Sequence, residues 1–215
     1  MDDVPIVVAG RELPDALDRI RRYCGLRWSG GPSETWAWHY YDEIPADPYD
    51  RVTPTDVVSA AALHPNLTKA ELTFFRERQE DLSAWLAEVP RGIRLWQTGD
   101  RVVEHLAGLP DVFSDVSLSL LSKVLHRKRK HLIPLLDRHV VDWYRPVTGK
   151  RAMTEAWGPI VRAMRDDELD DRQRLLYAIA FSGIERDLWP HDDVESRPRM
   201  SWIRAIDIAI WMGSR

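Results

Sequence analysis

Apolar residues recur every three or four positions along most of the chain, the spacing typical of amphipathic helices. Leu13, Leu17, Ile20 and Cys24 follow this spacing before Gly25 and predict a helix from 13 to 24. Thr53, Pro54 and Asp56 form a helix start, and Thr68 with Glu71 forms a capping box. The pattern predicts further helices at about 54–63, 68–89, 100–106, 116–130, 135–144, 155–165, 169–182 and 202–212. The predicted fold is therefore all-α, a compact helical bundle.

The segment from 28 to 50 departs from this pattern, because it is rich in Gly, Pro and aromatic residues. The alternation of Trp36, Trp38 and Tyr40 fits a strand, one arm of a small hairpin or an aromatic-rich loop. One interpretation is a loop that packs aromatic side chains over the helical core. The other is a platform on which these three residues stack against nucleobases or another planar ligand.

Composition places the chain among ordinary globular proteins. It has 215 residues, of which 44% are hydrophobic and 30% charged. No stretch reads as a linker, so we expect one helical domain over 1–215, as a single body or as two lobes with a cleft near 110–145. No window approaches 18 uncharged apolar residues, and the N-terminus lacks a signal-peptide pattern. We therefore expect no membrane association and a cytoplasmic location.

Charge is distributed unevenly along the chain. The formal net charge is −4, yet residues 123–151 hold nine Lys or Arg against two Asp, a local charge of +7. The remainder therefore carries −11. Such segregation favours a surface that faces a polyanion, although charge runs also occur as solvated helix faces.

The most informative segment, residues 114–140, joins this basic run to one carboxylate. A predicted helix ends in basic residues and is followed by Pro134 and by Asp137 at the start of the next helix. Cations at a helix C-terminus complement the dipole, and Asp137 can simply cap its helix. The functional alternative makes Asp137 an acid/base residue. In that hypothesis the candidate nucleic-acid-binding side chains are Lys123, Arg127, Lys128, Arg129, Lys130 and Arg138.

This segment resembles the core of the helix-hairpin-helix DNA glycosylase superfamily. Phe-Ser-Asp-Val-Ser at 113–117 takes the place of the hairpin, and Leu-Asp-Arg-His-Val at 136–140 takes that of the aspartate motif. The resemblance implies the glycosylase fold. It also implies that Asp137 lies beside a pocket for a flipped-out or single-stranded base of DNA or RNA.

The chain departs from the glycosylase pattern at three positions. Asp115 and Ser117 replace the hairpin glycines that let backbone N–H groups approach a phosphate, and a carboxylate there repels it. Ser119 stands where bifunctional members carry a lysine nucleophile, so strand cleavage by that route is not expected. Lys123 lies one helical turn further along and can face the same side as Ser119.

A second resemblance spans most of the chain. Residues 50–58, 121–125 and 202–211 are similar to a bacterial family known as a domain of unknown function. It implies no activity. Within the last of these segments, Asp207 lies in an apolar helix and needs a partner, for which Arg204 is the first candidate.

Three functions remain open from the sequence. The leading hypothesis is a glycosylase-like protein that engages nucleic acid and, if catalytic, hydrolyses an N-glycosidic bond. The second is an enzyme that acts on a small planar or anionic metabolite in a converted base pocket. The third is a non-catalytic module that binds a protein partner through a Trp-rich surface. We expect no cofactor and no metal site, because neither a phosphate-binding loop nor a metal-ligand spacing occurs.

Overall fold

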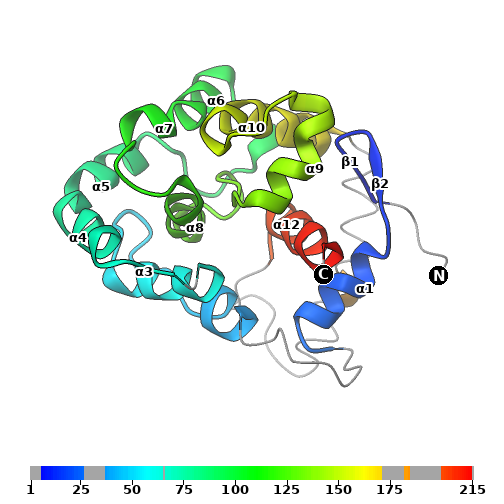
Figure 1. The fold of residues 1–215 in the computed structure, drawn as a ribbon, viewed down its shortest axis with the longest axis horizontal. Coiled ribbons are helices and arrows are strands. Elements are labelled where there is room, and N and C mark those ends of the chain that lie inside the picture. The colour runs from blue at the N-terminus through cyan, green and yellow to red at the C-terminus, as the bar shows by residue number, and fades with distance from the viewer. Residues whose placement is uncertain (1–5, 27–36, 65, 171–181, 185–199, 215) are drawn as a thin grey trace.

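The computed structural model describes residues 6–26, 37–64, 66–170, 182–184 and 200–214, and these are mostly helical (Figure 1). The all-α prediction is therefore confirmed for this part of the chain. The α-helices are α1 (Ala16–Tyr23), α3 (Pro54–Ala60), α4 (Lys69–Glu77), α5 (Gln79–Ala87), α6 (Asp100–Ala107), α7 (Leu109–Val112), α8 (Leu118–Lys128), α9 (Arg138–Thr148), α10 (Met153–Leu169) and α12 (Trp202–Gly213). Shorter turns are η1 (Trp38–Asp42, π-helical), η2 (Ala61–Leu63) and η3 (Leu95–Gln97). Residues 171–181 of the helix expected at 169–182 lie outside the described residues.

A small hairpin precedes the helices. Strands β1 (Ile6–Val8) and β2 (Arg11–Leu13) pair antiparallel, with Ile6 opposite Leu13. Ala9 and Gly10 connect them with φ of 53° and 68°, as a two-residue hairpin turn requires. The Ala9 N–H donates to both oxygens of Asp167, each at 3.1 Å, and thereby ties the hairpin to α10.

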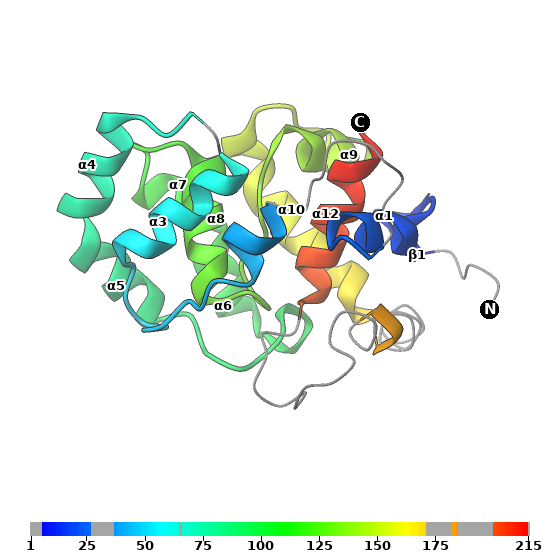
Figure 2. The ribbon, with the colours of Figure 1, turned by 90° about the horizontal axis from the view of Figure 1, so that it is seen from below.

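Helix α8 runs through the protein interior. Every residue from Leu118 to Lys128 is buried, and α3 and α10 pack against it. Helix α12 lies between α1 and α9, as Figures 1 and 2 show from two directions. A single cluster of buried hydrophobic residues extends through all of these helices. The basic end of α8 is consequently inside the protein and does not form a solvated helix face.

The predicted helix starts are confirmed, whereas one predicted helix is divided. Both capping boxes form, Thr53 with Asp56 and Thr68 with Glu71. The single helix expected over 68–89 is instead α4 and α5, which meet at Arg78 with φ −101° and ψ 16°. Ser83 donates to the Gln79 carbonyl at 2.7 Å within α5. The apolar face continues across the bend, so periodicity alone does not reveal it.

The strand expected at 36–40 is wrong for the residues that can be compared. Trp38 to Asp42 form the π-helical turn η1, and Trp36 lies outside the described residues. Trp38 and Tyr41 are buried while Tyr40 is exposed. The hairpin near the N-terminus therefore comes from 6–13, not from the aromatic segment.

Candidate functional site

A cavity of about 160 Å³ lies where α1, η2, α8, the start of α9 and α12 meet. Its apolar and aromatic wall includes Tyr23, Ala62, Leu63, Leu135, Ile208 and Trp211. Its charged wall consists of Lys123, Asp137, Arg204 and Asp207. Two of the residues singled out in the sequence, Asp137 and Lys123, are thus brought together at one cavity.

Asp137 caps α9 and also lines the cavity. It is the N-cap of α9, and its Oδ1 accepts the Val140 N–H at 2.9 Å. It also lines the cavity. Oδ2 accepts no hydrogen bond from the residues that the structure describes, so the helix engages only one of the two carboxylate oxygens.

Lys123 lies on α8, one helical turn after Ser119. Its Nζ donates to Ser119 Oγ at 2.7 Å, so the two residues do face the same side of α8. Burial lowers the pKa of the Lys123 ammonium, and the carboxylates of Asp137 and Asp207 counteract this effect. A buried amine of this kind exchanges its proton more readily than a surface lysine does.

Arg204 organises the far side of the cavity. Its guanidinium donates to Asp42 Oδ1 and Oδ2, both at 2.8 Å, and pairs with Asp207. The Tyr23 hydroxyl, which Arg204 also contacts, donates to Asp42 Oδ2 at 2.9 Å. The ion pair between Arg204 and Asp207 expected from the sequence is therefore confirmed. Its extension to Asp42 and Tyr23 was missed, because no local spacing links residues so far apart in the chain.

Asp207 is the most perturbed carboxyl of the cavity. Burial raises its pKa to about 7, and the negative charge of Asp137 adds to this effect. Arg204 and Lys123 act in the opposite direction. Because Arg204 already serves Asp42, it compensates only part of the cost of ionising a second buried carboxyl. The cavity therefore contains an acid that exchanges its proton near neutral pH.

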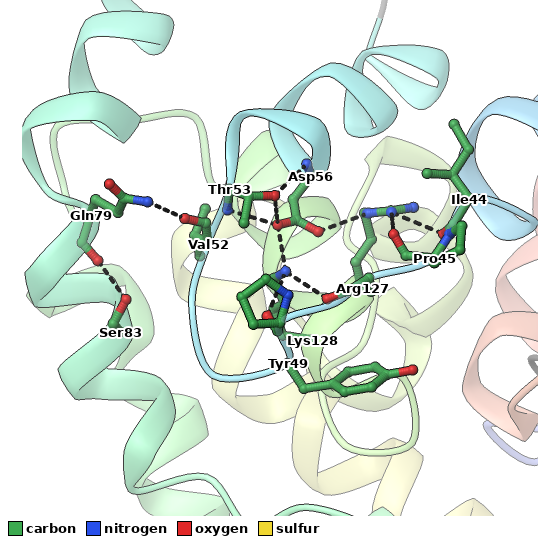
Figure 3. A network of polar contacts seen from close by, with 12 residues as sticks. Ile44, Pro45, Tyr49, Val52, Thr53, Asp56, Gln79, Ser83, Arg127 and Lys128 are labelled. Atoms are coloured by element: carbon green, nitrogen blue, oxygen red, sulfur yellow. Dashed lines mark hydrogen bonds and ion pairs between the residues drawn. The ribbon is translucent and has the colours of Figure 1, made fainter.

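The basic run at the end of α8 is used inside the protein (Figure 3). Arg127 donates to the carbonyls of Tyr41, Ile44 and Pro45, and its Nε lies 3.2 Å from Asp56 Oδ1. Lys128 donates to the carbonyls of Ala46 and Pro48, at 2.8 and 3.1 Å, and pairs with Asp56. These side chains hold the segment 41–48 against α8, and they present no charged face to a phosphate backbone.

The remaining candidate cations are divided between the interior and the surface. Arg129 is buried and donates to the carbonyls of Leu86, Val89 and Tyr49. Lys130 is half-buried at a separate cleft. The Arg138 side chain is 86% exposed and lies 3.7 Å from Asp142 on α9. These cations therefore do not form the expected continuous basic surface. The sequence pattern does not reveal this, because it carries no information on which cations find carbonyl partners.

The aromatic residues form core more than surface. Trp38 is buried, donates to Glu43 Oε1 at 2.9 Å and packs edge-on against Tyr23. Tyr40 is 62% exposed. Trp38, Trp85, Trp157 and Trp202 are all buried. Trp96, Trp143 and Trp211 are half-buried. Trp38 and Tyr40 thus do not form a stacking platform together.

Asp137 follows two helices and an irregular segment in the chain. The short helix α7, a turn at 113–117 and α8 are succeeded by an irregular segment and then by α9 with Asp137 at its start. Asp115 in the turn is 77% exposed and lies 3.9 Å from Arg78. A carboxylate at this position disfavours the phosphate contact that the glycosylase hairpin makes.

The described residues form a mostly helical protein whose cavity is lined by both acidic and basic side chains. Residues 16–214 match the model of the DUF6308 family, a family of unknown function, and the chain belongs to this family. The resemblance to a domain of unknown function is thereby confirmed. No curated protein and no solved structure matches the chain. No helix among the described residues combines the length and apolarity needed to cross a membrane.

Proposed function

We propose that the cavity binds a small, planar, polar molecule and that Asp137 acts on it as an acid/base residue. The observation that carries this proposal is the convergence of Asp137, Lys123 and Asp207 on one cavity with Tyr23 and Trp211. Its volume of about 160 Å³ is close to that of engineered cavities, roughly 150 Å³, that accept benzene. A single heteroaromatic ring is therefore the size of ligand that fits.

The polar groups supply a complementary set of donors and acceptors. Asp137 Oδ2 is an acceptor, Lys123 is a donor, and the Asp207 carboxyl is a donor or an acceptor according to pH. Such a set recognises a ring that carries both N–H and carbonyl groups. Lys123 and Asp207 are buried. Interactions with such groups are stronger than in water, since the local dielectric constant is lower.

The chemistry that this geometry favours is proton transfer. A carboxylate fixed by its own helix can orient a water molecule, or take a proton from a ring nitrogen, if the atoms lie within hydrogen-bond reach. With a ligand that carries an N-glycosidic bond, Asp137 would stabilise the positive charge that develops on the sugar as the C–N bond breaks. This is the hydrolysis that the glycosylase resemblance implies, here applied to a small molecule.

A small ligand is favoured over a nucleic acid, because the side chains expected to contact phosphates are engaged elsewhere. Arg127, Lys128 and Arg129 are engaged with internal carbonyls and carboxylates. Asp115 occupies the turn where a phosphate would have to approach. A pocket for a single nucleobase is thus better supported than a surface that binds a nucleic-acid strand.

Binding and turnover test this proposal. Free nucleobases, nucleosides and related heterocycles are titrated into the wild type, Asp137→Asn and Ala62→Phe and followed by NMR shift perturbation. Asp142→Asn, on the surface of the same helix, is the matched control for loss of charge. We expect a ligand for the wild type and Asp142→Asn, and weaker binding or no turnover in Asp137→Asn. No binding is expected in Ala62→Phe, because the larger side chain fills the cavity.

Two results would overturn the proposal. One is a folded wild type that binds none of the compounds at millimolar concentration. The other is a bound compound whose affinity and turnover are equal in all three variants. A parallel titration with single-stranded DNA at low salt tests the nucleic-acid hypothesis directly, because salt-sensitive binding there, without small-molecule binding, would favour the polymer.

A further inference from the structure

The charged groups of the cavity do not balance one another. Asp137 and Asp207 line it, and Asp42 lies behind its wall, where both carboxylate oxygens are bonded to Arg204. The cations of the wall are Lys123 and Arg204. Three carboxylates thus meet two cations, so one negative charge is in excess when all five groups are ionised.

The neighbouring titratable groups do not supply the missing positive charge. The Tyr23 hydroxyl is neutral, because burial raises its pKa well above the usual value. His64 is neutral at pH 7, because burial and the nearby Lys123 ammonium lower its pKa. Glu71, 3.6 Å from His64, is a further carboxylate. Among the described residues, the charges that act on the Asp207 carboxyl are those of Arg204, Asp137 and Lys123.

Two carboxylate oxygens of the cavity accept no hydrogen bond from the residues that the structure describes. The Val140 N–H engages Asp137 Oδ1 and leaves Oδ2. Arg204 engages Asp207 Oδ2 and leaves Oδ1. One of these oxygens comes from the start of α9 and the other from α12, and both residues line the same cavity. A ligand with N–H donors can therefore meet both.

A proton is one way to supply the missing positive charge. Burial raises the pKa of Asp207 to about 7, and the charge of Asp137 adds to this effect, although Arg204 and Lys123 oppose it. A ligand cation placed between the two carboxyls relieves the same excess of negative charge. Such a ligand competes with the proton of Asp207, because each compensates the same group.

We propose that the ligand of this cavity is a planar monocation of the amidinium or protonated aminoheterocycle class, whose N–H groups donate to Asp137 Oδ2 and Asp207 Oδ1. The inference rests on the proposed function for the place of the ligand, and it adds the charge. Hydrogen bonds between an ionised donor and a carboxylate are roughly twice as strong as those between neutral groups. One ring with an amidinium substituent also suits a cavity of about 160 Å³.

Benzamidinium, which stays protonated near neutral pH, is the probe, and neutral benzamide of nearly the same shape is its matched control. Both are titrated into the wild type by calorimetry from pH 5 to 8. At pH 8 we expect benzamidinium to bind about tenfold or more tightly than benzamide. Its affinity should rise by about tenfold per pH unit up to pH 7 and then level off, because below the pKa of Asp207 the ligand must displace a proton. The affinity for benzamide should not rise over this range.

Proton release gives an independent readout that needs no variant. Titration at pH 5.5 in two buffers of different ionisation enthalpy should show about one proton released for each benzamidinium bound, and almost none at pH 8. Asp207→Asn removes the excess negative charge, so the preference for benzamidinium and its pH dependence should both disappear. Asp142→Asn, which removes a carboxylate from the surface of α9, should keep both.

The outcomes separate this inference from the proposed function. Equal affinity for the two probes, a benzamidinium affinity that is constant between pH 5 and 8, or binding of neither probe would overturn the inference. If neutral heterocycles bind and benzamidinium does not, the proposed function stands and the cationic ligand is refuted. If benzamidinium binds with proton release and no neutral heterocycle binds, the cation site stands and the acid/base role of Asp137 on a neutral ring is refuted.

Discussion

Arg127 and Asp56 form an ion pair that is buried on both sides, although the two residues are 71 positions apart in the chain. Asp56 also accepts the Thr53 N–H at 2.8 Å and the Thr53 hydroxyl at 2.7 Å, as the acid of the capping box of α3. It pairs with Lys128 as well. One carboxylate therefore starts a helix and compensates two cations of α8.

We predict that Arg127→Met lowers the free energy of unfolding by about 3–5 kcal/mol, the range measured when one partner of a buried pair is removed. The loss arises because the carbonyls of Tyr41, Ile44 and Pro45 lose their donor while Asp56 keeps only Lys128. Urea denaturation followed by circular dichroism measures it. Arg138→Ala, at an exposed position, should stay within about 0.5 kcal/mol of the wild type. Equal midpoints for the two variants would refute the structural role of Arg127.

The structural role of these buried cations determines which variants can test nucleic-acid binding. Replacement of the whole run 127–130 by Ala would remove the donors that hold 41–50 and Val89, so a loss of binding would report unfolding. Arg91, Lys130 and Arg138 are the useful positions, because none of these side chains is fully buried.

Trp38 and Tyr40 give a second prediction, which separates core packing from ligand stacking. Trp38→Ala should cost about 3–5 kcal/mol, since the side chain is buried and packs against Tyr23. Tyr40→Ala should change stability by no more than about 0.5 kcal/mol, because the ring is exposed. Thermal unfolding of both variants checks this contrast. Similar small effects in the two would mean that Trp38 is not part of the core.

The sequence predicts local features well. Capping signals such as Thr53 with Asp56 depend on residues three apart, and the structure contains them. The pair Arg204 with Asp207 has the same short range. The apolar face of each helix likewise follows from spacing alone, so most helix positions could be predicted within a few residues.

The sequence does not show where a charged side chain lies in the folded protein. The run at 127–129 has the composition of a surface patch, yet each side chain meets carbonyls from residues about 40 to 86 positions away. The set of residues that line the cavity likewise depends on tertiary packing. Asp137 and Lys123 were identified from a motif, whereas Tyr23 and Trp211 join them only because α1 and α12 pack together.

Asp137 provides a third prediction, because its capping role and its charge can be separated. Asp137→Ala removes the acceptor for the Val140 N–H and should cost about 1 kcal/mol, within the 0.5–2 kcal/mol known for lost caps. Asp137→Asn keeps a good cap and should cost less. Guanidinium denaturation ranks the two. Equal losses for Asn and Ala would show that the charge, which both variants remove, and not the cap sets the contribution of this residue.

The last prediction concerns pH and Asp207. The pKa of this carboxyl is raised from 3.8 to about 7 in the folded protein, so between these values the folded state binds the proton more tightly than the unfolded state does. The contribution of Asp207 to the free energy of unfolding is therefore present at low pH and is lost as the pH rises from about 4 to 7. In Asp207→Asn the side-chain amide does not titrate, so this contribution to the free energy of unfolding is absent.

We accordingly expect the stability of the wild type, relative to Asp207→Asn, to fall across this window and to level off above it. Urea denaturation at half-unit steps of pH measures the difference, and a flat difference between pH 4 and 7 would contradict the raised pKa. Asp137→Asn tests the electrostatic coupling between the two carboxyls. Since the charge of Asp137 contributes to the raised pKa of Asp207, neutralising it should move the upper end of the window to lower pH, which links the two carboxyls through the cavity that they share.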